Sequence, residues 1–180
     1  LQGNGAGNAV WSGVLKDDAD GNKLKVTKQG AGRWIYGNAM TYTGATEVEA
    51  GVLELGTRGS VDSSPVTLKG GALAVSGPET KTLASLTVAG DCAVELADGA
   101  SLALTELAQT SGTLSVTIGD GATLKCAALA GQSPSWLTVN GANGEFDANG
   151  KLIKQTYRLT DSIPARGGVI PDGADKVVGI

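Results

Sequence analysis

The amino-acid sequence predicts an all-β fold, a parallel β-helix in which each repeat forms one rung of a solenoid. Apolar and polar residues alternate with period two, as in strands whose side chains point to opposite faces. Glycines interrupt this alternation every several residues, where turns need a positive φ. The pattern recurs with an offset of 20 to 22 residues, a period typical of solenoids.

Composition favours many thin layers over one thick core. The chain of 180 residues has 28 Gly and only seven aromatic residues, from three Trp, three Tyr and one Phe. Val, Leu, Ile and Ala must therefore supply the apolar bulk. The net charge is −4 and no basic cluster occurs, so we expect no nucleic-acid binding. No apolar run reaches the roughly 20 residues of a membrane span, so we expect no membrane insertion by this chain, which we expect to be a fragment of a longer protein.

The chain contains no His, which removes several kinds of chemistry. Ser-His-Asp and Cys-His nucleophile systems and all His metal ligands are excluded. The sequence therefore indicates no catalytic residues, no cofactor-binding residues and no metal ligands, and we expect no cofactor.

The N-terminal region is expected to form a first strand and a polar turn. Residues 9–15 alternate around Trp11, and residues 17–22 read Asp-Asp-Ala-Asp-Gly-Asn. Clustered carboxylates suit a calcium loop, but aligning Gly21 with the EF-hand glycine puts Lys16 at the first ligand position. A hairpin turn built on Asp-Gly-Asn is the favoured interpretation.

The stretch 24–56 is the best copy of the repeat, with four short strands separated by glycine turns. Residues 51–56 and 71–77 match at an offset of 20, and residues 94–107 and 116–129 match at an offset of 22. Every segment alternates with period two and none has helical spacing. This distinguishes the pattern from a leucine-rich repeat and predicts β-helix rungs over 1–130.

The pattern breaks after residue 130. A strand is expected near residues 136–139, and residues 144–159 are expected to form a hairpin around Asn149-Gly150. We interpret 131–180 as an irregular β cap or hairpin region, or as the start of a following module. A solenoid needs such an end because an open rung exposes unpaired strand edges.

Residues 24–56 resemble the autotransporter-associated β-strand repeat, also called the passenger-associated transport repeat. That family has an apolar-x-Lys-x-Gly-x-Gly segment, two apolar positions, an Asn-x-Tyr-x-Gly-x-Thr core and a closing Gly-x-Leu-x-Leu-Gly. The chain departs from it at Ala39-Met40 and Ala45, and has Trp34 and Tyr36 where Leu is usual. The matching positions are Val26, Lys28, Gly30, Gly32, Tyr42, Gly44, Thr46, Val48, Gly51, Leu53, Leu55 and Gly56.

The resemblance implies a right-handed parallel β-helix in a secreted or surface-displayed bacterial protein. In that family the repeat is structural, is linked to passenger export and folding, and has no catalytic residues. It implies a non-catalytic passenger or spacer segment. An adhesin or glycan-binding module, with surface glycans or host and matrix proteins as partners, is the alternative, and a polysaccharide-active enzyme fragment is a third. The oligomeric state is not indicated.

Three residue pairs could carry chemistry. Trp34 and Tyr36 could stack on sugars, but their alternation with Ile35 favours packing in the core. Asp98 and Asp120 lie one rung apart and could form a carboxylate pair, but each precedes Gly in a turn.

Cys92 and Cys126 are both expected to point inward, because each shares the parity of neighbouring aliphatic residues. Two buried thiols acting as small apolar residues are the favoured state, and a disulfide across the core is the alternative.

Overall fold

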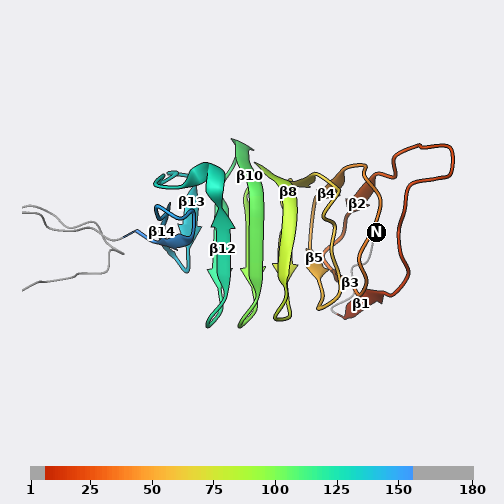
Figure 1. The fold of residues 1–180 in the computed structure, drawn as a ribbon, viewed down its shortest axis with the longest axis horizontal. Coiled ribbons are helices and arrows are strands. Elements are labelled where there is room, and N and C mark those ends of the chain that lie inside the picture. Colours follow the sequence, from red (N-terminus) through yellow and green to blue (C-terminus); the bar gives the residue numbers. More distant parts are fainter. Residues whose placement is uncertain (1–6, 156–180) are drawn as a thin grey trace, which may run out of the picture.

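The computed structural model describes residues 7–155 and shows an elongated β-solenoid (Figure 1). Its strands stack in sequence order along the long axis, from β1 at the N-terminal end to the β13–β15 region at the other. From β1 to β13, successive strands alternate between two sheets, so each rung contributes to both. The predicted all-β parallel solenoid is therefore confirmed.

The first sheet has nine strands, and every pairing from β1 to β13 is parallel. In spatial order the strands are β1 (Asn8–Trp11), β3 (Arg33–Tyr36), β5 (Val52–Leu55), β7 (Ala72–Val75), β9 (Cys92–Leu96), β11 (Leu114–Ile118), β13 (Leu137–Val139), β14 (Ala142–Phe146) and β15 (Leu152–Lys154). Only its last two pairings, β13–β14 and β14–β15, are antiparallel.

The second sheet has six strands, all paired in parallel. They are β2 (Val26–Lys28), β4 (Thr46–Val48), β6 (Val66–Leu68), β8 (Thr80–Ala89), β10 (Ser101–Ser111) and β12 (Thr123–Cys126), and a 3₁₀ turn, η1 (Ala127–Leu129), follows β12. The long strands β8 and β10 cover two sides of the solenoid. The second half of β8 pairs with β6, whereas the first half of β10 pairs with β12.

The register of the sheets reproduces the repeat read from the sequence. Leu53 pairs with Leu73 at an offset of 20, and Val94 pairs with Val116 at an offset of 22. Because each inward residue lies over its counterpart in the next rung, aliphatic side chains form continuous stacks. Both predicted offsets are confirmed.

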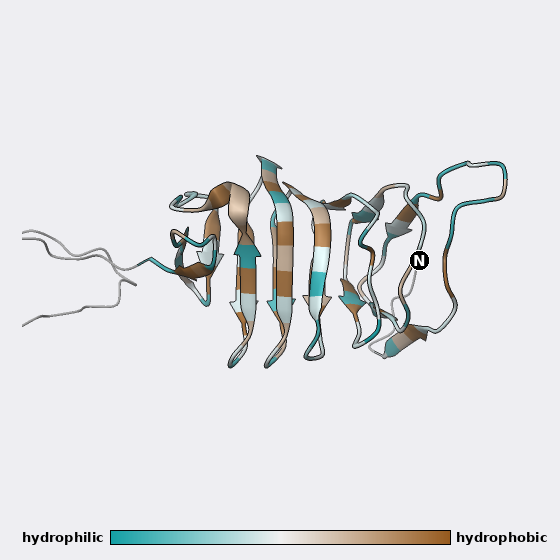
Figure 2. Ribbon diagram, in the orientation of Figure 1, coloured by the Kyte–Doolittle hydropathy of each residue, from teal (hydrophilic) through white to brown (hydrophobic). Residues whose placement is uncertain are grey.

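One hydrophobic cluster runs through the interior from Val26 to Leu152. Figure 2 shows its origin as brown bands that alternate with pale or teal ones along β8, β10 and β12. Burying every second residue of each strand removes apolar surface from water in every rung. No rung has a closed core of its own, so each rung depends on its neighbours.

The turns between rungs approach each other closely. At Gly59, an added Cβ would lie 2.0 Å from the carbonyl oxygen of Tyr36 in the previous rung. Only a residue without a side chain fits there, since that neighbour is backbone and cannot turn away.

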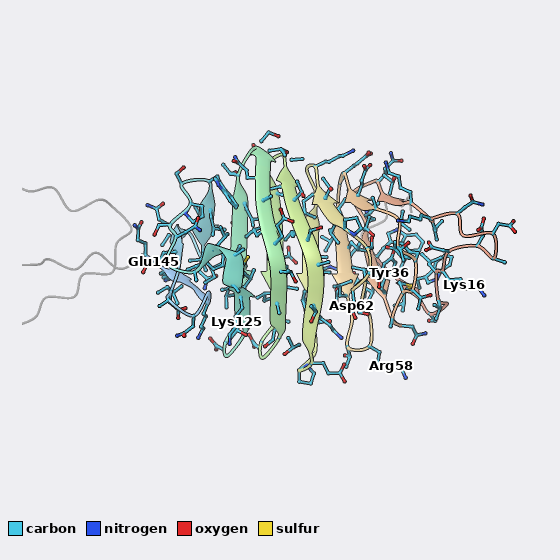
Figure 3. All side chains as sticks on the ribbon, turned by 45° about the horizontal axis from the view of Figure 1, so that its top comes forward. Lys16, Tyr36, Arg58, Asp62, Lys125 and Glu145 are labelled. Carbon is cyan, nitrogen blue, oxygen red and sulfur yellow. The ribbon has the colours of Figure 1, made fainter. Side chains whose placement is uncertain are left out.

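The first strand is shorter than the sequence suggested. β1 ends at Trp11, and residues 12–25 form an extended excursion on which Lys16 projects outward (Figure 3). The excursion is attached to the next rung, where the amide of Thr41 donates to the carbonyl of Leu15 at 2.9 Å.

The C-terminal end changes from parallel to antiparallel pairing. β13 still pairs in parallel with β11, and the β14–β15 hairpin then turns at Asn149-Gly150 as predicted. The amide of Cys126 donates to the carbonyl of Gly150 at 2.8 Å, so the hairpin also covers the edge of β12. The predicted hairpin is confirmed as far as residue 155, and its remainder lies outside the described residues. The division at residue 130 into repeats and a cap or following module stays a prediction.

Candidate functional site

The outer face of the first sheet carries a cluster of three charged side chains and one hydroxyl, Arg33, Glu54, Glu95 and Ser76, which we call the outer-face cluster. Nη1 of Arg33 donates to Oε2 of Glu54 at 2.7 Å, and Nη2 donates to Oε2 of Glu95 at 2.8 Å. Oγ of Ser76 donates to the second oxygen of Glu54 at 2.7 Å. Burial alone would lower the pKa of Arg33, but its hydrogen bonds and charge attraction to the two carboxylates outweigh this and raise the pKa.

This cluster spans four neighbouring strands, and a small alanine on the third strand leaves room for its side chains. Arg33 is on β3, Glu54 on β5 and Glu95 on β9, and Ala74 on the intervening β7 is only 4% exposed. The same residues line a shallow hollow in the sheet surface. The Arg33 guanidinium pairs with both carboxylates, offsets one of their two negative charges and fills the space between them. A pair of catalytic carboxylates needs that space for substrate.

Trp34 and Tyr36 lie on the inner side of β3, as predicted. Tyr36 is fully buried, and Trp34 is half-buried and packs against the core. Figure 3 shows Tyr36 within the body of the solenoid, whereas Arg58 projects from a turn. Tyr42 is also buried. These three aromatic side chains therefore contribute to packing and offer no exposed stacking platform.

A chain of hydroxyls crosses the interior beside these tyrosines. Tyr42 Oη lies 2.5 Å from Thr46 Oγ1, which lies 2.8 Å from Ser64 Oγ, and Ser64 donates to the carbonyl of Gly44 at 2.7 Å. Burial and the neighbouring Tyr42 raise the pKa of Tyr36, whose own hydroxyl lies outside this chain of bonds. The sequence did not reveal this chain, although Thr46 shares the inward parity of Val48.

Lys28 is the most unusual side chain in the interior, because it is fully buried and its ammonium contacts only main-chain oxygens. Nζ donates to the carbonyls of Gln29 at 3.0 Å, Gly30 at 2.7 Å and Ala50 at 3.0 Å. Burial lowers the pKa of this ammonium. The sequence reasoning missed it, although its alternation with Val26 could have placed it on the inner face.

The acidic residues at 17–22 form a turn, as the favoured interpretation predicted. Asp18 accepts hydrogen bonds from the amides of Asp20 and Asn22, and Gly21 has a φ of +82°. Asp17 accepts from the amides of Leu24 and Thr43, which ties the excursion to the next rung. Hydrogen bonds, chiefly from Leu24 for Asp17 and from Asn22 for Asp18, lower the pKa of both carboxyls. Among residues 7–155, no group of three His, Cys, Asp or Glu side chains is arranged to hold a metal ion.

Asp98 and Asp120 stack one rung apart, as their spacing predicted. The carboxylate of Asp98 accepts a hydrogen bond from the amide of Asp120 at 2.9 Å. The amide of Gly99 donates to the carbonyl of Asp120 at 2.8 Å. These contacts join successive turns, so a structural role accounts for an aspartate at both positions.

Both cysteines are buried and free, and they lie in different sheets, Cys92 on β9 and Cys126 on β12. Burial raises the pKa of each thiol. The inward orientation is confirmed: the Cys126 thiol packs as a small apolar group, and the Cys92 thiol also donates to the carbonyl of Gly90 at 3.2 Å.

Comparison with known families places a second, independent constraint on the chain. Residues 26–55 match the family model of the passenger-associated transport repeat. This confirms the resemblance noted for residues 24–56. Neither the curated proteins nor the solved structures give a significant match.

The matched segment covers the first two strand pairs of the solenoid, β2–β3 and β4–β5. It contains the buried Lys28 ammonium and the Tyr42–Thr46 hydroxyl pair, whereas the buried polar side chains of Ser64 and Lys81 lie beyond it. A repeat of this family in a β-solenoid fits a passenger segment of an autotransporter, and the repeat family is structural. No helix in residues 7–155 combines the length and apolar character needed to cross a membrane.

Proposed function

We propose that this chain is a non-catalytic structural segment of a secreted or surface-displayed bacterial protein, acting as a passenger spacer. The observation that carries the proposal is the hydrophobic core, which begins in the matched passenger repeat at residues 26–55 and continues through the stacked rungs that follow it. A rod whose length grows with each rung can hold other parts of a protein away from a surface without any chemistry of its own.

The polar groups on the surface support the same interpretation. Both carboxylates of the outer-face cluster are paired with the Arg33 guanidinium, and the aspartates at turns bond to the next rung. These side chains serve the stacking of rungs. Surface glycans or host and matrix proteins remain the partners to test.

Removal of one complete rung tests the spacer function directly. Because Val94 pairs with Val116 at an offset of 22, deletion of residues 97–118 joins Leu96 to Gly119 in register. The matched control deletes residues 97–107, which is half a rung and sends the following strand to the wrong sheet. Both variants are placed ahead of an autotransporter barrel, and surface display is measured on intact cells with an antibody to an N-terminal epitope.

If the chain acts as a spacer, the full-rung deletion should be displayed at a level close to that of the unaltered chain. The half-rung deletion should lose surface display. The purified full-rung variant should keep its β-sheet circular dichroism and be shorter by about 4.8 Å in small-angle scattering. Equal loss of display by both deletions would overturn the proposal. So would saturable binding of the intact chain to a glycan or matrix protein that Arg33→Met abolishes, since that result assigns a binding function to the outer face.

A further inference from the structure

We propose that the main-chain carbonyls of residues 29, 30 and 50 form an ammonium-binding cage, which Lys28 occupies to lock two successive turns of the solenoid together. This inference concerns the matched segment itself and does not depend on the spacer function.

The first argument is the position of Lys28 in the register. Lys28 pairs with Val48, Val48 pairs with Leu68 and Leu68 pairs with Val88, so the next three rungs place apolar side chains at this point of the interior. A lysine there must remove its ammonium from water, which is costly unless each N–H finds an acceptor. Three acceptors within 3.0 Å match the three donors of an ammonium.

The second argument is the origin of the acceptors. Gln29 and Gly30 belong to the turn that follows β2, whereas Ala50 belongs to the turn that follows β4, one rung further along. One ammonium therefore bonds to two rungs at once. The oxygens can approach the ammonium because residue 51 has no side chain. A Cβ on Gly51 would lie 2.7 Å from Nζ and 2.4 Å from the oxygen of Gly30.

The third argument is a comparison with the other buried lysine. Lys81 is 4% exposed, but its Nζ reaches one carbonyl, that of Thr57 at 2.5 Å, and lies 3.6 Å from the carboxylate of Glu79. Lys81 has a counter-ion within salt-bridge distance. Lys28 is held by carbonyl dipoles, and its ring of acceptors selects a group that carries several N–H donors.

The first experiment is hydrogen exchange on Lys28→Met, with Lys25→Met as the matched control. Lys25 is exposed and pairs with Glu47 on the surface. Met fits the apolar stack, so the overall stability of Lys28→Met can change in either direction. The turns report the lock, because the amide of Glu49 donates to the carbonyl of Lys28 and that of Val52 to Gly32.

We expect exchange of the Glu49 and Val52 amides to accelerate about tenfold or more in Lys28→Met. The reason is that the cage carbonyls of residues 29, 30 and 50, in the same turns, lose their charged donor. Exchange at Gly119, several rungs away, should stay unchanged in both variants. If Glu49 and Val52 are protected equally in Lys28→Met and Lys25→Met, the lock does not exist.

The second experiment tests the cage as a binding site. Lys28→Ala removes the equivalent of n-propylammonium, so added n-propylammonium chloride should raise the denaturation midpoint of this variant. Tetramethylammonium chloride at the same concentration has no N–H donor and should not. The wild-type chain and Lys25→Ala should not distinguish the two salts. No selective stabilisation of Lys28→Ala by propylammonium would refute the cage, and if that variant does not fold even with the amine, exchange in Lys28→Met decides.

Discussion

The close approach of turns at Gly59 gives a sharp prediction about what holds the rungs in register. In Gly59→Ala, the new methyl group would lie 2.0 Å from the carbonyl oxygen of Tyr36 and 2.9 Å from the amide nitrogen of Gly56. Ordinary contact needs about 3.4 Å or more, so the two turns must separate by more than an ångström. That movement breaks the bond between the turns, from Gly56 N to Tyr36 O at 3.1 Å, and the close contact with Gly56 N disrupts the bond within the turn, from Gly59 N to Gly56 O at 2.9 Å.

Two lost hydrogen bonds cost about 1 kcal/mol each, and a buried carbonyl without a donor costs about 1–3 kcal/mol more. We therefore expect Gly59→Ala to lower the free energy of unfolding by about 3–5 kcal/mol. The matched control is Gly99→Ala, because Gly99 has a φ of +71° but open space around it. Its cost is backbone strain alone, about 1–2 kcal/mol.

The assay is urea denaturation of the full chain followed by far-ultraviolet circular dichroism, with m-values compared among the three proteins. A loss in Gly59→Ala no larger than that in Gly99→Ala, at unchanged m, would refute the steric argument.

Three further outcomes are expected. Leu73→Ala, at a fully buried position in the central stack, should cost about 2–5 kcal/mol in urea denaturation, whereas Val10→Ala, 59% exposed, should cost less than about 0.5 kcal/mol; equal effects would contradict the continuous core. Hydrogen bonds from Lys25 and Lys69 lower the pKa of Glu47. The contribution of Glu47 to the free energy of unfolding is therefore present above the unfolded pKa of about 4.5, and it is lost as the pH falls through the lower pKa of the folded state. The difference in unfolding free energy between wild type and Glu47→Gln should therefore shrink from pH 7 to pH 3, and a constant difference would exclude this role. Cys92 and Cys126 should resist alkylation in the native chain and both react in urea without reductant; labelling of neither thiol in urea would indicate a disulfide.

The sequence predicted the faces of the strands well, because strand geometry alone fixes the alternation. The inward positions of Tyr36 and Cys126 follow from period two, and the pairings of Leu53 with Leu73 and Val94 with Val116 follow from the offsets. The turn at Asp18 was also predictable, since an Asx turn uses bonds within a few residues.

The groups that the sequence did not reveal depend on stacking between rungs. Arg33 and Glu95 are 62 residues apart and meet only because four strands of one sheet lie side by side, with Ala74 leaving room between them. The Lys28 ammonium likewise needs the carbonyl of Ala50 from the next turn.

By itself, the sequence determined that this protein is a β-solenoid, since periodicity and glycine spacing are local properties that the backbone must obey. It also determined the family of the repeat, through the motif at residues 26–55. The tertiary structure decided where charge is compensated and which polar groups are buried. Those outcomes depend on distances between rungs, and a side chain such as Lys28 becomes an internal ligand only when a second turn is stacked against the first.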